Sequence, residues 1–243
     1  MNSSNRHSFV RQILEKTSKD SMAWSIDTVL SGDSCQSLAF LNAHAINNAA
    51  KNPDFFHFLM STNFLLRDGI GVKMAMKLFD LEPGENLNGT DLISKIIPRY
   101  KDKSIALFGA SIEALEAAKD RLATEENVHS IVSLEHGFHD FSVYFETCDV
   151  HHPDIVILCM GMPKQELLAA DLIKRQAAKL VICGGGWADF YSGTKKRAPE
   201  WVRKCSLEWV YRLLLEPKRL GKRYTIDILF YFYVILKNRF IAG

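Results

Sequence analysis

The chain has 243 residues, 47% of them hydrophobic, which is enough for one large domain or two smaller ones with a real core. The formal net charge of +2 hides an asymmetry: residues 195–243 hold twelve Lys or Arg and four acids, about +8, against about −6 elsewhere. We therefore expect an anionic partner for the tail. We expect no nucleic acid among the partners.

The cysteines exclude a disulfide scaffold. They are five, an odd number, and no two have CxxC spacing. Three lie in or beside apolar runs, where a thiol acts as a small hydrophobe. We expect a reduced, cytoplasmic compartment, and the first residues lack the apolar core of a signal peptide.

The first half of the chain predicts two strands that end in polar residues. Residues 1–20 predict a loose helix or an arm, 37–41 a strand, and the next residues to 51 a helix. Asn42, at that junction, is either a helix N-cap or an amide that faces a cleft. A second strand, 63–67, precedes Asp68 and its glycines, which form either a turn or a substrate-facing carboxylate.

Further along, helices are predicted to begin at capping residues. After a helix over 72–79, the next opens near Asn88, with Thr90 as the expected cap and Asp91 at the positive helix end. Residues 101–103 resemble a link between lobes.

The second half repeats strand, glycine turn and helix. Strand 105–108 leads into Gly109 and Ser111, which form either an anion site at a helix N-terminus or a plain Ser111 cap. A GxGxxG fingerprint is missing, so a dinucleotide site is poorly supported. Strand 130–134 ends at Glu135 and Gly137, beside histidines whose spacing fits no zinc pattern.

Two apolar runs, 155–159 and 180–183, each end at glycine and flank a helix that starts at Pro163. This order is typical of a parallel sheet, in which ligands bind beyond the carboxyl ends of the strands. The residues 161–166 and 184–186 fall at two such ends.

The C-terminal segment differs in character. Residues 226–236 are almost wholly apolar and aromatic, with cations on both sides, but are too short for a bilayer span of about 20 residues. The pattern suits the surface of an anionic membrane. The alternative is a helix that packs on the core or in an oligomer.

Four blocks carry a resemblance. GMPKQE at 161–166, GGGWADFYSG at 184–193, KRAPEW at 196–201 and LEWVYRLLLEPKR at 207–219 resemble the signature series of the WecG/TagA/CpsF family of bacterial glycosyltransferases. The resemblance covers about residues 37–240. The chain departs from the family at Phe40, where a Thr is frequent, and at residues 85–87, where no Arg is present.

The resemblance implies an α/β fold of two Rossmann-like lobes with parallel sheets and a basic, aromatic C-terminal helical appendage. The implied boundaries are 1–100 for the lobe with the catalytic Asp, 101–195 for the nucleotide-sugar lobe and 196–243 for the appendage. The family transfers a hexose, an N-acetylhexosamine or a uronic acid from a UDP-sugar to a polyprenyl-diphosphate-linked saccharide, for surface polysaccharides or cell-wall polymers. It places the enzyme peripherally on the inner face of the membrane.

By that resemblance, Asp68 is the base of an inverting transfer. The chain has no D-x-D motif, so we expect neither metal nor cofactor, and cations must neutralise the leaving diphosphate. Arg212 is a candidate, although it could instead pair with Glu208. The expected substrate-binding residues are Asn42, Asp91, Gly109, Ser111, Glu135, Gly137, Gly161, Pro163, Lys164, Gln165, Glu166, Gly185, Arg197, Arg212, Arg219 and Arg223.

Two other functions remain open from the sequence. One is a non-enzymatic, membrane-recruited module that binds a nucleotide, and the other is a Rossmann-type oxidoreductase. The sugar, the acceptor and any homo-oligomer are not determined by these patterns.

Overall fold

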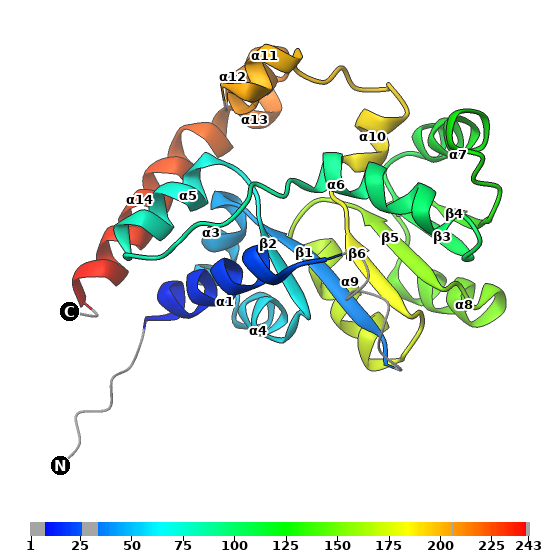
Figure 1. Ribbon diagram of the computed structural model, residues 1–243, viewed down its shortest axis with the longest axis horizontal. Coiled ribbons are helices and arrows are strands. Elements are labelled where there is room, and N and C mark those ends of the chain that lie inside the picture. Colours follow the sequence, from blue (N-terminus) through cyan, green and yellow to red (C-terminus); the bar gives the residue numbers. More distant parts are fainter. Residues whose placement is uncertain (1–7, 26–33, 206, 242–243) are drawn as a thin grey trace.

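The computed structural model describes residues 8–25, 34–205 and 207–241, which form an α/β fold around a parallel sheet (Figure 1). The predicted α/β class with parallel strands is confirmed. The six strands are β1 (Gln36–Leu41), β2 (Phe64–Arg67), β3 (Ile105–Gly109), β4 (Ile131–Glu135), β5 (Ile155–Cys159) and β6 (Leu180–Cys183). Their order is β2-β1-β6-β5-β3-β4, with every neighbouring pair parallel.

The strands of the two expected lobes belong to one sheet, which differs from the two sheets expected. Strand β6 joins the two groups of strands, because its Ile182 is in register with Leu38 of β1 on one side and with Ile157 of β5 on the other. All four residues of β6 are buried, as suits a central strand covered on both faces. The chain passes from β2, at one edge, to β3, on the other side of the sheet.

Helices cover both faces of the sheet. Successive side chains of a strand point to opposite faces, so each strand contributes residues to two hydrophobic cores. In β1, Ala39 and Leu41 join one core, while Leu38 and Phe40 join the other. The first core includes α3 (Ala43–Lys51), α4 (Pro53–Ser61), α5 (Ile70–Leu78), α8 (Phe141–His151) and α9 (Lys164–Lys174). The second includes α6 (Gly89–Ile96), the 3-10 helix η1 (Ile97–Tyr100), α7 (Ile112–Glu126) and α10 (Trp187–Tyr191). All five cysteines are free, and four of them are buried.

A loose helix or an arm was predicted for residues 1–20, of which residues 1–7 lie outside the described part of the chain, and the described residues form a packed helix instead. Residues from 8 onward form α1 (Phe9–Ala23), whose Val10, Ile13 and Leu14 are fully buried. These positions follow the helical period, so α1 buries one apolar stripe against the first core.

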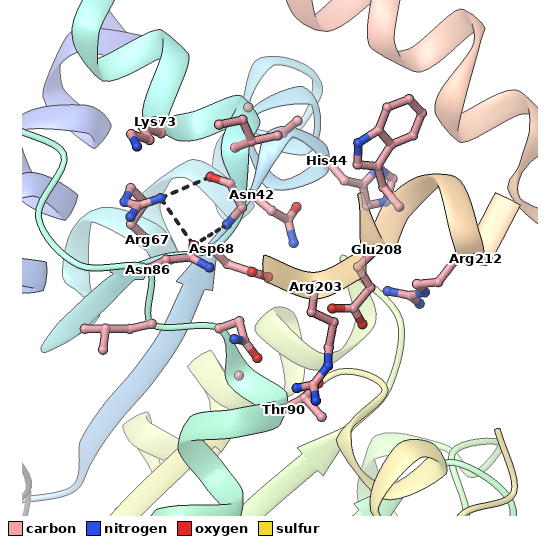
Figure 2. A pocket seen from close by; sticks show the side chains of 18 of the residues that line it. Asn42, His44, Arg67, Asp68, Lys73, Asn86, Thr90, Arg203, Glu208 and Arg212 are labelled. Atoms are coloured by element: carbon pink, nitrogen blue, oxygen red, sulfur yellow. Dashed lines mark hydrogen bonds between the residues drawn. The ribbon is translucent and has the colours of Figure 1, made fainter. Parts of the chain in front are cut away.

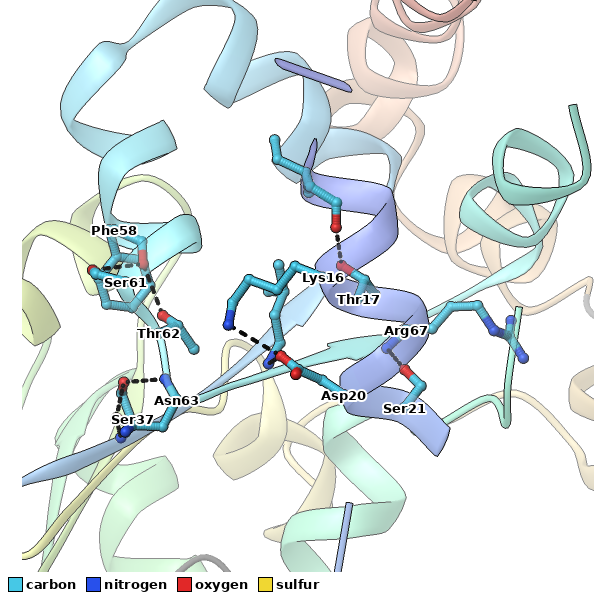
Figure 3. Close-up of polar contacts among 12 residues, drawn as sticks. Lys16, Thr17, Asp20, Ser21, Ser37, Phe58, Ser61, Thr62, Asn63 and Arg67 are labelled. Atoms are coloured by element: carbon cyan, nitrogen blue, oxygen red, sulfur yellow. Dashed lines mark hydrogen bonds and ion pairs between the residues drawn. The ribbon is translucent and has the colours of Figure 1, made fainter. Parts of the chain in front are cut away.

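Helix α1 also covers the free edge of β2 (Figure 3). The Asp20 carboxylate accepts a hydrogen bond from the Leu65 N–H at 2.9 Å, and Ser21 Oγ accepts one from the Arg67 N–H at 2.9 Å. Side chains thus satisfy donors that an edge strand otherwise leaves open. The strand that precedes Asp68 is therefore fixed on both sides, by β1 and by α1.

The C-terminal segment consists of α11 (Glu200–Lys204), α12 (Glu208–Leu215), α13 (Pro217–Tyr224) and α14 (Ile226–Ile241). Helix α14 packs on α3 and α1, next to α5 (Figure 1). Among the described residues, no helix is both long and apolar enough to cross a membrane.

Candidate active site

A cavity of about 1000 Å³ opens where β1 and β2 end (Figure 2). We call it the Asp68 cavity. Its wall comes from the strand ends, from the starts of α3, α5 and α6, and from α11 to α14. The basic C-terminal segment thus closes over the end of the sheet where ligands of parallel sheets bind.

Asp68 lies at the base of this cavity. Its N–H donates to the Leu41 carbonyl at 2.8 Å, and Gly69, with φ of +90°, turns the chain into α5. Removal from water, and then the negative charge of Glu208, raise the pKa of Asp68 to about 6, against the effects of an Asn42 hydrogen bond, Arg212 and Arg223. A carboxylate with this pKa is a capable base near neutral pH.

Asn42 fills both roles left open by the sequence. Its Oδ1 accepts from the Ala45 N–H at 3.0 Å, which caps α3. The same side chain gives the hydrogen bond that stabilises the charged form of Asp68. An N-cap with a free amide group can therefore orient a neighbouring carboxylate.

Arg67 fixes the turn that carries Asp68 (Figure 2). The residue is 5% exposed, and its guanidinium donates to the carbonyls of Pro83, Gly84 and Gly69 at 2.9, 3.2 and 3.3 Å, and to Asn86 Oδ1 at 3.2 Å. Asn86 Oδ1 also accepts from the Gly69 N–H at 2.8 Å. Neither residue was expected at the site from the sequence.

The start of α6 contributes a carboxylate that is paired with cations. The cap is Asn88, which accepts from the Asp91 N–H at 3.0 Å, so the prediction of Thr90 as the cap is wrong. The helix begins at Gly89, and Thr90 therefore lies inside its first turn. Asp91 binds Arg197 directly and lies 3.5 Å from Arg203 Nη1, and this network lowers the pKa of Asp91.

Helices α12 and α13 bring both signs of charge to the cavity. Glu208 Oε1 lies 3.8 Å from Arg197 Nε. The guanidinium carbon of Arg212 lies over the Phe190 ring, 5.1 Å from its centroid. Arg212 and Arg223 both line the cavity and favour the charged form of Asp68. The side chain of Arg219, also predicted here, lies outside the described residues.

The wall formed by α3 carries a neutral polar group. Burial, and then the positive charge of Arg223, lower the pKa of His44 to about 4. Asn47 donates to the Asp227 carbonyl at 2.6 Å and so connects α3 to α14. His44 therefore offers the cavity a neutral donor or acceptor near neutral pH.

A second group of predicted residues meets at the carboxyl ends of β3 and β4. Gly109 has φ of +111°, and a Cβ there would lie 2.5 Å from the Cys159 carbonyl, so only glycine fits. The Gly137 N–H donates to the Ala110 carbonyl at 3.0 Å, and Ser111 caps α7, as one of its predicted roles requires. Phe138, unexpected from the sequence, is 82% exposed beside these turns.

The block from 161 to 166 adjoins the same turns. Lys164 Nζ donates to the Gly137 carbonyl at 3.0 Å, and Gln165 Oε1 accepts from the Gly185 N–H at 2.9 Å. Glu166 is 1% exposed, and its burial raises its pKa to about 7, although Gln165 donates to it at 2.7 Å. These residues bind one another and hold the glycine turns together.

The comparisons with known proteins decide the family. The model of the Glycosyl transferase WecG/TagA/CpsF family matches residues 9–242. The chain belongs to the WecG/TagA/CpsF glycosyltransferase family. It is 32% identical over 182 residues, 73% of this chain and 71% of the relative, to an N-acetylglucosaminyldiphosphoundecaprenol N-acetyl-β-D-mannosaminyltransferase of Bacillus subtilis. It is 26% identical over 224 residues, 89% of this chain and 87% of the relative, to the enzyme of the same name in Staphylococcus aureus.

In this glycosyltransferase, the predicted site residues lie in two separate places. The cavity brings together Asp68, Asn42, Asp91, Arg197, Arg212 and Arg223. The turns at β3 to β6 hold Gly109, Ser111, Glu135, Gly137, Gly161, Pro163, Lys164, Gln165, Glu166 and Gly185, none of which lines that cavity. Glu135 is engaged by His139 at 3.2 Å and by Thr147 at 3.2 Å.

Several cavity residues carried no local signal in the sequence. They come from segments far apart in the chain: His44, Arg67, Lys73, Asn86, Arg203 and Glu208. Within the described part of the chain, no group of three or more His, Cys, Asp or Glu side chains is placed to hold a metal ion.

Proposed function

We propose that this enzyme transfers an N-acetylhexosamine from a UDP-sugar to a polyprenyl-diphosphate-linked saccharide, with inversion at the anomeric carbon. The single observation that carries the proposal is Asp68, held in a cavity among arginines with a pKa of about 6. The relatives in Bacillus subtilis and Staphylococcus aureus, named for transfer to a diphosphoundecaprenol-linked sugar, support the choice of acceptor.

In the proposed reaction, Asp68 accepts the proton of the acceptor hydroxyl. The hydroxyl oxygen attacks the anomeric carbon from one face, and the bond to the diphosphate breaks on the other, so UDP leaves with the bonding electrons. Asn42 orients the carboxylate, and Arg67 with Asn86 fixes the turn that presents it. A positioned base of this kind contributes about 10²- to 10⁴-fold to the rate.

The leaving diphosphate is neutralised in this proposal by arginines of the C-terminal segment, without a metal. Arg212 and Arg223 line the cavity that holds Asp68, and Arg197 lies at the same wall. A guanidinium donates two hydrogen bonds in a fixed fork, which suits phosphate oxygens. The absence of a D-x-D motif is consistent with this assignment.

We place the nucleotide at the glycine turns after β3 and β4. From β3 the chain continues to β4 on one side, whereas from the adjacent strand β5 it continues to β6 on the opposite side. Ligands of open parallel sheets usually bind in the crevice at such a reversal of direction. Gly109 and Gly137 let these turns pack directly on neighbouring backbone, Gly109 on Cys159 and Gly137 on Gly109, and α7 begins there with its N–H groups. The exposed Phe138 ring offers a surface for base stacking.

We assign the C-terminal helices to the inner membrane surface. Large apolar side chains are exposed on them, among them Trp201, Leu214, Ile226 and Leu229 at 68, 75, 61 and 71%. Cations alternate with these side chains along the segment, a combination that suits anionic headgroups.

UDP release tests the proposal. The protein is incubated with a panel of UDP-sugars, with and without a polyprenyl-diphosphate-N-acetylglucosamine acceptor in detergent, and the product anomer is determined by NMR. We expect acceptor-dependent release from one donor, an inverted product and full activity in EDTA. UDP binding without release from any donor would support a nucleotide-binding module instead, and loss of activity in EDTA would contradict the metal-free assignment.

A further inference from the structure

Helices α5 and α14 lie side by side and are joined near both ends (Figure 1). At the start of α5, Tyr231 Oη donates to the Gly71 carbonyl at 2.9 Å. At its end, Arg239 Nε donates to the Leu78 carbonyl at 2.8 Å, and Arg239 also lies 3.0 Å from an Asp80 oxygen. The two helices therefore form a fixed surface.

Each helix leaves an apolar stripe exposed along this junction. On α5, Ile70, Met74 and Leu78 are 39, 54 and 38% exposed, and their spacing of four residues places them on one face. On α14, Phe232 and Leu236, 44 and 45% exposed, follow the same spacing. We call these five residues the α5–α14 strip. Its α5 part spans about 12 Å along the helix axis.

The strip is continuous with the Asp68 cavity. Ile70, Met74 and Phe232 line that cavity, while Leu78 and Leu236 lie one turn further from it along their helices. A hydrophobic ligand group on the strip would therefore be attached to whatever reacts at Asp68.

The order of chemistry along this path matches one kind of substrate. Asp68 comes first, then the N-terminal turn of α5 and the Lys73 side chain at the cavity wall, then the apolar strip. A polyprenyl-diphosphate saccharide carries the same order: a hydroxyl for the base, a diphosphate for a cation and a helix N-terminus, and an apolar chain.

We infer that the α5–α14 strip binds the first isoprene units of the acceptor's polyprenyl chain and that Lys73 contacts its diphosphate. The inference rests on the proposed function, because it assigns a subsite to the acceptor of that reaction. It separates the acceptor path, along α5, from the donor diphosphate at the arginines of α12 and α13, and Figure 2 shows Lys73 of α5 and Arg212 of α12 on opposite sides of the cavity.

Chain-length dependence tests this assignment. The full-length protein is assayed without membranes or detergent, with acceptors that carry one head group on a geranyl, a farnesyl or a longer chain. In the wild type, kcat/KM should rise with added isoprene units and level off once the chain extends beyond the strip. In Leu78→Ser and Leu236→Ser, the ratio of kcat/KM between farnesyl and geranyl acceptors should fall by about fivefold, through KM.

The matched control is Ile226→Ser, which alters an exposed side chain of the same helix outside the strip and should keep the wild-type ratio. Lys73→Met should raise KM for all acceptors, and Lys73→Arg should restore it. A wild type without chain-length dependence, or strip variants with an unchanged ratio, would overturn the inference while leaving the transferase intact. If strip variants and control instead lose vesicle binding equally, the strip contacts the bilayer and the inference is wrong. Absence of transfer to every acceptor would count against the proposed function itself.

Discussion

At the scale of single residues, the cavity holds a carboxylate in an environment that opposes its charge. Burial and Glu208 raise the pKa of Asp68, while Asn42, Arg212 and Arg223 counter them, and the result is about 6. A carboxylate with this pKa is ionised at neutral pH and still able to accept a proton.

The pH profile follows from this balance. We expect kcat/KM to rise with pH through about 6, because Asp68 must lose its proton before it can act. Glu208→Gln removes a nearby negative charge, so the acid limb should move to lower pH. Asp68→Asn should lower kcat by about 10²- to 10⁴-fold without loss of the fold. Steady-state rates between pH 5 and 9 check these points, and a folded Asp68→Asn protein with normal turnover would exclude Asp68 as the base.

The buried carboxyl group of Glu166 should make the stability of the fold depend on pH. Burial raises its pKa from 4.5 to about 7 in the folded state, so its contribution to stability is fully present below 4.5 and is lost as pH rises through 7. Glu166→Gln should abolish this loss and stabilise the protein at pH 8 by at most about 3 kcal/mol, with no gain near pH 4.5. Urea unfolding at the two pH values measures the difference. The exposed Glu116→Gln is the control and should change neither value.

At the scale of elements, strands and their glycine turns were predictable because their signals are local. The expected strand at 155–159 and that at 180–183 coincide with β5 and β6, and Asn42 directly follows β1 as expected. The sheet was not predictable in the same way, because the pairing of β6 with β1 joins segments about 140 residues apart, and no local pattern encodes such a partner.

The composition of the cavity shows the same limit. Asp68 was predicted from its place after a strand together with the family resemblance, whereas Glu208 was expected only as a possible partner of Arg212, and Arg203 only as one of the cations of the tail. They reach the cavity only because α11 and α12 fold back over the sheet, where they meet Asp91 and Arg197. Thr90 and Asn88 are both suitable N-cap residues, and only the structure shows that α6 begins at Gly89 and is capped by Asn88.

The contact between α1 and the edge of β2 gives a prediction at this scale. Ser21→Ala and Asp20→Ala each leave a strand N–H without its acceptor, which should destabilise the fold by about 1–3 kcal/mol each. Chemical unfolding measures the loss, with the exposed Lys19→Ala as control. If both variants match the wild type, water or another group satisfies the edge and α1 is not its stabilising cover.

At the scale of the whole molecule, the charge asymmetry seen in the sequence becomes a spatial one. The basic segment from residue 195 forms the helices that close the Asp68 cavity and that expose apolar side chains beyond it. The same segment thus supplies cavity cations and the proposed membrane surface, so its docking on a membrane and its closure over the donor can be linked.

Vesicle binding and truncation separate these two roles. We expect the protein to bind vesicles rich in anionic phospholipid and to lose this binding as salt rises, because exposed cations are screened. Neutralising Lys218 and Lys222, which lie outside the cavity lining, should weaken vesicle binding, by about 1 kcal/mol for each charge near the surface, while transfer to a short-chain acceptor in solution persists.

Deleting the residues after Glu216 removes Arg223 as well and should abolish transfer even in solution, because the cavity then lacks one wall. A fully active truncation would show that α13 and α14 supply neither the cations nor the closure that the reaction needs.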